Sequence, residues 1–151
     1  MKYLFLVTLI VFVSCKQNKE KKSVPILEQQ EVSSEEFHKS VDGVVTLNNG
    51  KLWQANPETT TGINNMKKRM QSFTEIENIE AYSTLKAGLE ADFTELFQKC
   101  TMTGEAHNQL HNYLFPFIDL FDGLASTELN TCKKSCNQLE VHLNDYSTYF
   151  K

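Results

Sequence analysis

Residues 78–100, with the sequence NIEAYSTLKAGLEADFTELFQKC, contain the clearest folding signal in the chain. Apolar side chains recur there every three or four residues, which places them along one stripe of an α-helix. Asn78 precedes the stripe, in the position of a helix-capping residue. The stripe consists of Tyr82, Leu85, Leu89, Phe93, Leu96, Phe97 and Cys100. The stretch therefore predicts an amphipathic helix that buries one face.

Three further segments repeat this pattern, at about residues 57–75, 105–126 and 127–150. Asn56 and Pro57 are expected to be the N-cap and the first residue of the first segment. Pro116 should kink the second segment, because proline lacks an N–H and clashes with the preceding turn. Short links between long helices favour antiparallel neighbours, so the sequence predicts an all-α, up-and-down four-helix bundle.

The segment before the bundle has the composition of a β-hairpin. Residues 44–47 (VVTL) and 51–53 (KLW) flank Asn48-Asn49-Gly50, and Asn-Gly is a preferred pair for a two-residue hairpin turn. We therefore expect a short β-hairpin in front of the first helix.

The N-terminus has the features of an export signal. Met1-Lys2 precedes a largely apolar run over residues 3–13, which is shorter than the ~20 residues that a membrane span needs and typical of a signal peptide. Phe12-Val13-Ser14-Cys15 resembles the lipobox of bacterial lipoproteins. The resemblance implies that residues 1–14 are removed and that Cys15 carries the lipid. The alternative is an ordinary secreted protein in which Cys15 is structural.

Residues 15–40 are then expected to form a flexible tether between the lipidated cysteine and a single domain over residues 41–151. Residues 16–22 contain four lysines and one glutamate, which suit a position beside anionic lipid headgroups. Residues 23–151 contain 10 basic and 18 acidic residues, a charge that argues against binding nucleic acid. The predicted location is the cell envelope, anchored by lipid to the periplasmic face or the outer membrane.

The other three cysteines fall at opposite ends of the predicted bundle. Cys100 ends the second helix, whereas Cys132 and Cys136 begin the fourth, so Cys100 should lie too far from either to form a disulfide. Cys132 and Cys136 share one face of their helix. That spacing suits core packing, and it leaves open a metal site or a strained intrahelical disulfide.

Residues 100–111 (CTMTGEAHNQLH) hold the densest set of potential metal ligands. His107 and His111 are four residues apart on one helix face, a spacing at which two imidazoles can reach one ion. Gly104 allows the chain to turn, so that Cys100 and Met102 can approach them. Sulfur and imidazole donors together favour copper, and thiolate with imidazole also suits zinc. The predicted metal ligands are therefore Cys100, Met102, His107 and His111.

Two stretches carry a resemblance that covers about residues 42–151. Cys-Thr-Met-x-Gly-x-Ala-His-x-x-Leu-His at residues 100–111 and Trp-x-Ala-Asn-x-Glu-Thr at residues 53–59 resemble small helical lipoproteins of Bacteroidota. The resemblance implies a helical envelope protein and transfers no activity.

Other functions have weaker sequence support. The chain contains no C-x-x-C-H haem attachment site, no glycine-rich phosphate loop after a strand and no nucleophile with a recognisable base, so an enzyme is not predicted. Noncovalent haem between Met66 and His111 is a subsidiary possibility. The main alternative to a metal site is a ligand-free structural or protein-interaction lipoprotein that docks an envelope partner.

Overall fold

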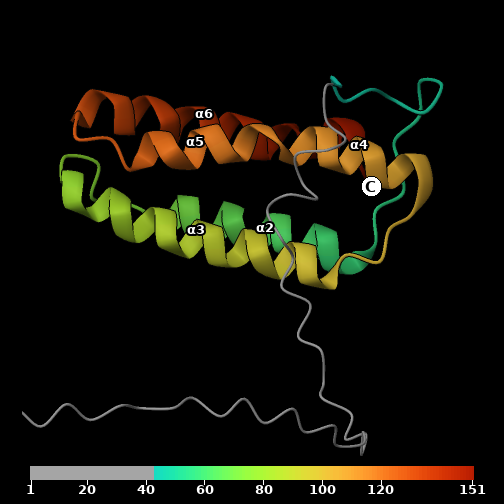
Figure 1. Ribbon diagram of the computed structural model, residues 1–151, viewed down its shortest axis with the longest axis horizontal. Helices are drawn as coiled ribbons and strands as arrows, with labels where there is room; N and C mark the ends of the chain where they lie inside the picture. The colour runs from blue at the N-terminus through green and yellow to red at the C-terminus, as the bar shows by residue number, and fades with distance from the viewer. Residues whose placement is uncertain (1–42) are drawn as a thin grey trace, which may run out of the picture. The chain divides into compact units, whose positions relative to one another are not determined.

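The computed structural model describes residues 43–151, which form helices joined by short loops (Figure 1). The helices are α2 (Pro57–Ser72), α3 (Ile79–Lys99), α4 (Gly104–Leu114), α5 (Pro116–Leu124) and α6 (Leu129–Tyr149). The expected all-α fold is confirmed for this part of the chain. None of these helices is both long and apolar enough to cross a membrane. The expected signal peptide, the lipidated Cys15 and the tether over residues 15–40 lie outside the described residues.

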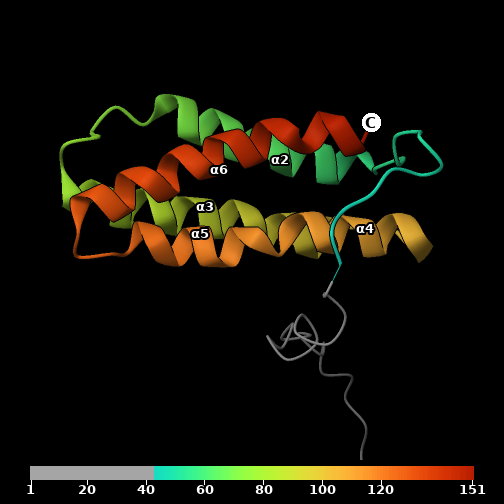
Figure 2. The same cartoon turned by 90° about the horizontal axis from the view of Figure 1, so that it is seen from above.

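The helices form two layers, with α5 and α6 in one and α2 and α3 in the other (Figures 1 and 2). Contacts between the layers join α2 to α6 and α3 to α5. The chain reverses direction after each long helix. As a result, the start of α2, the end of α3, the start of α4 and the end of α6 meet at one end of the bundle.

Pro116, which was expected to kink the third predicted helix, instead divides it into α4 and α5. Phe115 keeps α-helical backbone angles, and its N–H bonds to the His111 carbonyl at 2.9 Å. Pro116 has no N–H to continue that pattern, so α5 begins with it as a new first residue.

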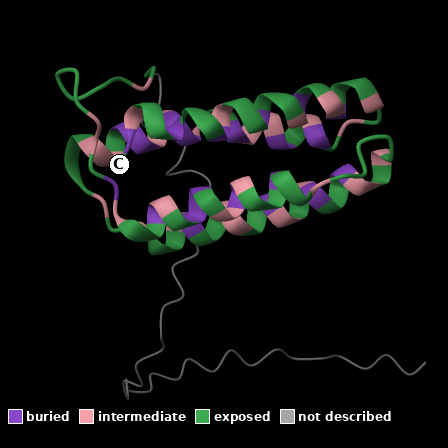
Figure 3. Ribbon diagram, turned by 180° about the vertical axis from the view of Figure 1, so that it is seen from behind, coloured by how far each residue is buried: buried purple, intermediate pink, exposed green. Residues whose placement is uncertain are grey.

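Buried residues line the inward sides of the helices, and exposed residues cover the outward sides (Figure 3). The predicted apolar stripes supply most of the core. The largest fully buried side chains include Tyr82, Tyr113, Phe117, Ile63, Met66, Leu89, Leu110 and Leu139. Met66 therefore packs in the apolar core between the helices. Burial of each such side chain contributes roughly 1.5–3 kcal/mol.

The predicted hairpin is not confirmed, since residues 43–56 contain only isolated bridges. Asn48 and Lys51 exchange backbone hydrogen bonds of 2.9 and 3.0 Å across a turn in which Asn49 and Gly50 have positive φ. The arms then part, because their backbone groups find other partners. The N–H of Thr46 donates to Gln109 on α4, and the segment that follows the turn pairs with residues 149–151.

The two asparagines predicted as helix caps behave differently. Asn78 accepts a hydrogen bond from the N–H of Glu80 at 3.1 Å, so its capping role is confirmed. Asn56 occupies the N-cap position of α2, but its side chain makes no capping bond. The side-chain amide of Asn56 instead donates to the Lys99 carbonyl at the end of α3.

Candidate metal site

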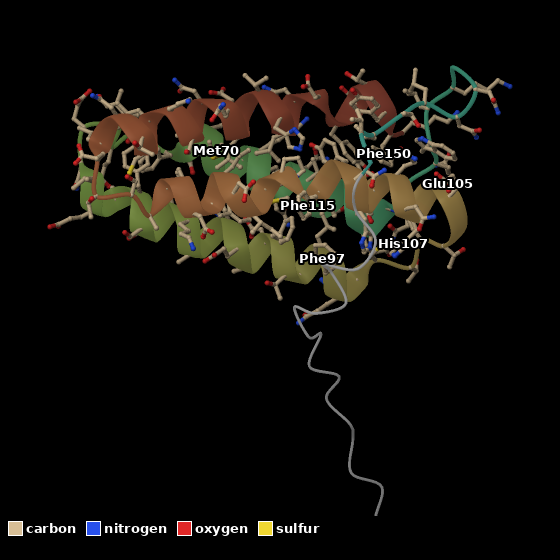
Figure 4. All side chains as sticks on the ribbon, turned by 45° about the horizontal axis from the view of Figure 1, so that its top comes forward. Met70, Phe97, Glu105, His107, Phe115 and Phe150 are labelled. Carbon is tan, nitrogen blue, oxygen red and sulfur yellow. The ribbon has the colours of Figure 1, made fainter. Side chains whose placement is uncertain are left out.

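Cys100 and His107 lie against each other where α3 gives way to α4. Cys100 is the C-cap of α3, and its Sγ is 3.7 Å from Nδ1 of His107, in the first turn of α4. Gly104 makes this approach possible: its φ of +64° is a left-handed conformation that glycine adopts without strain, and it lets the chain reverse. Figure 4 labels His107 near the start of α4. The sequence prediction that these two residues approach is confirmed.

His111 lies one helical turn beyond His107, and the two imidazole rings are adjacent. Their centroids are 4.3 Å apart with an interplanar angle of 56°. The other side of His111 meets the edge of Phe97 from α3, at a centroid distance of 5.7 Å. The spacing of four residues thus brings both imidazoles to one helix face, as predicted.

Burial favours the neutral form of His111. Desolvation lowers the pKa of His111 below its ordinary value of 6.5, and the neighbouring His107 lowers it further. A neutral imidazole has a nitrogen lone pair with which to bind a metal, whereas an imidazolium ion does not. The lowered pKa of His111 therefore favours the form that can bind a metal.

Met102 makes its polar contact with α2. Its Sδ is 3.8 Å from the hydroxyl Oγ1 of Thr59, which is fully buried. Met102 itself is partly buried and packs on the core. The thioether thus lies on the same loop as Cys100, and its polar contact is with Thr59 on α2.

The donors are close without being gathered around one point. Among residues 43–151, no three His, Cys, Asp or Glu side chains are arranged to hold a metal ion. The structure therefore contains a pair, Cys100 with His107, and a third donor, His111, whose ring lies beside that of His107 at a tilt. Cys100, Met102, His107 and His111 are all partly buried, so solvent reaches this end of the bundle.

Two carboxylates, Glu105 on α4 and Glu58 on α2, are engaged by amides. Glu105 accepts hydrogen bonds from Gln109 at 2.8 Å and from Asn108 at 3.2 Å, and these bonds lower its pKa. Glu58 accepts one from Asn56 at 2.9 Å. The sulfur and imidazole donors are thus accompanied by oxygen donors that already have protein partners.

All three described cysteines are free thiols. Cys132 is fully buried, and its thiol donates to the carbonyls of Leu124 and Ser126. Cys136 is partly buried, and burial raises the pKa of its thiol. The core-packing interpretation is therefore confirmed for this pair.

His142 belongs to a different environment. Its Nε2 lies 2.7 Å from the Tyr113 carbonyl, and the Tyr113 hydroxyl donates to the His142 carbonyl at 2.8 Å. The two rings stack at 4.7 Å. His142 also lines a groove of 530 Å³ between α5 and α6, beside the exposed Val141. It serves helix packing and is not a member of the candidate site.

Sequence reasoning missed two residues that shape this end of the bundle. Tyr113 is fully buried at the centre of an aromatic cluster, although its spacing of three from Leu110 and four from Phe117 would have placed it on the stripe. Thr59 is fully buried as well. A polar residue in the first turn of a helix does not indicate burial from the sequence alone.

Comparisons of the chain with known protein families, with curated proteins and with solved structures find no match, so the arrangement of Cys100, His107 and His111 is the basis for a functional proposal.

Proposed function

We propose that this protein binds a soft metal ion, copper or zinc, through Cys100, His107 and His111, with Met102 as a further sulfur donor. The observation that carries the proposal is the 3.7 Å distance between Cys100 Sγ and His107 Nδ1. A metal at ~2.3 Å from a thiolate and ~2.0 Å from an imidazole, at a tetrahedral angle, separates the two donors by ~3.5 Å. The pair therefore has the spacing of two metal ligands before any metal is bound.

The chemistry of the donors supports the same class of ion. Thiolate, thioether and imidazole suit copper and zinc, whereas magnesium and calcium prefer carboxylate and carbonyl oxygen. The carboxylates of Glu105 and Glu58 are committed to amide groups. A rotation of the His111 side chain would supply the third donor, since its ring is already next to that of His107.

The ion would be held at the membrane surface. Because Ser14-Cys15 ends a short apolar run, we propose a lipid anchor on Cys15 and a location in the cell envelope. The protein would act there as a metal-binding or metal-buffering lipoprotein and not as an enzyme.

The anchor is tested by Cys15→Ala. Acyl labelling and partitioning into detergent should both be lost, because the mutant has no thiol to accept the lipid. The matched control is Cys136→Ala, which should retain both. Labelling that persists in Cys15→Ala would rule the site out.

Metal binding is tested on the full-length protein in detergent, with Zn²⁺ or with Cu⁺ under a non-thiol reductant. Binding to the native state alone raises stability, by about 2.7 kcal/mol when free metal is about 100 times its Kd. The melting temperature should therefore rise with added metal, and metal analysis should find about one ion per chain. If neither ion binds, the metal site is refuted, and the ligand-free interaction module takes its place.

A further inference from the structure

The side chain of Asn56 crosses from the start of α2 to the end of α3. Its Nδ2 lies 3.3 Å from the Lys99 carbonyl and 3.3 Å from the Thr101 hydroxyl, the two residues that flank Cys100. The same nitrogen lies 2.9 Å from Glu58 Oε2, so two N–H bonds are shared among three acceptors. Asn56 thus contacts the residues on both sides of Cys100, the candidate thiolate ligand.

Thr59, one turn further along α2, continues this contact to the other sulfur. Its buried hydroxyl donates to Oδ1 of Asn56 and lies 3.8 Å from the Met102 Sδ. Asn56 and Thr59 therefore contact residues 99, 101 and 102 through a single connected network. His107 contacts the remaining member of this loop, Cys100, from the other side.

This network replaces an ordinary helix cap. An asparagine at the N-cap usually accepts a hydrogen bond from its own helix, and Asn78 does so on α3. In Asn56 the donor group is directed to the α3–α4 loop, and the acceptor group is occupied by Thr59. The start of α2 is thereby used to hold a loop that carries two sulfur atoms.

We infer that Asn56 and Thr59 are positioning residues of the metal site, which fix the loop over residues 99–102 so that the Cys100 thiolate faces His107. The inference rests on the proposed metal binding. Groups that hold a ligand in place typically contribute about 10-fold to 100-fold to metal affinity. The hydrogen bonds of Asn56 and Thr59 also bring the sequence stretch at residues 53–59 against the start of the stretch at residues 100–111.

The test is Asn56→Asp, measured on the full chain by competition with a colorimetric chelator for Zn²⁺ and for Cu⁺. Aspartate keeps the acceptor for Thr59 and remains a good N-cap, but it cannot donate to Lys99 or Thr101. Metal affinity should fall about 10-fold to 100-fold, while helix content stays unchanged. The added negative charge alone would favour a cation, so it cannot account for a loss.

Asn137→Asp, at an exposed position on α6, makes the same chemical change away from the loop and should retain wild-type affinity.

If Asn56→Asp also lowers the melting temperature of the metal-free protein, Thr59→Val repeats the test from the Met102 end with a side chain of nearly the same size. In either variant, the thiolate-to-cobalt absorption of the Co²⁺-substituted protein should weaken. Wild-type affinity in both variants would overturn the inference and leave the metal site standing. Absence of metal binding in the wild-type chain would overturn both.

Discussion

Replacing His107 and His111 together by alanine should abolish metal binding while leaving the fold in place. The change removes two of the four proposed donors, and a zinc or copper ion needs three or four. The loss should exceed the ~100-fold typical of groups outside the coordination sphere. Metal analysis after dialysis should find no bound ion, and added metal should no longer raise the melting temperature.

The helices should survive this change because neither imidazole is part of the fully buried core. The core positions of α4 are Leu110, Tyr113 and Leu114, and they remain intact. His142→Ala is the matched control, since that histidine packs on Tyr113 and lies outside the candidate site. The proposal fails if the double variant keeps its metal, or if His142→Ala loses it to the same extent.

Most of the fold follows from the periodicity of apolar residues. Three of the four stripes that recur at three and four residues each form one helix, and the third is divided into α4 and α5 at Pro116. The hairpin failed for a reason outside its own sequence. Its turn forms, but Gln109 and the C-terminal residues compete for the backbone groups that would have extended the ladder. Local turn chemistry cannot reveal such long-range partners.

The candidate site was predictable only as a set of residue types at one end of the bundle. Helical spacing placed His107 beside His111, and the turn at Gly104 returned the chain toward Cys100. The orientation of Met102 toward Thr59 and the use of Asn56 as a bridge depend on side-chain hydrogen bonds between α2 and the loop. These contacts join residues more than 40 positions apart, and periodicity carries no information about them.

The aromatic cluster around Phe117 should contribute strongly to the stability of the bundle. The ring is fully buried on α5, and four other rings surround it. Their centroid distances are 5.7 Å for Phe93, 5.8 Å for Tyr113, 5.8 Å for Phe121 and 4.9 Å for His142. These residues come from α3, α4, α5 and α6, so the cluster links both layers of the bundle.

Phe117→Ala should therefore lower the free energy of unfolding by about 3–5 kcal/mol, because it removes buried apolar surface and leaves a cavity that the surrounding rings cannot fill. That is a large share of the 5–15 kcal/mol typical of a domain. Urea unfolding followed by circular dichroism at 222 nm measures the change. Val141→Ala, at an exposed position on α6, is the control and should change stability by less than about 0.5 kcal/mol. A loss below about 1 kcal/mol in Phe117→Ala would mean that the ring is not packed among the four helical segments as described, since partial relaxation reduces the cost of such a cavity without removing it.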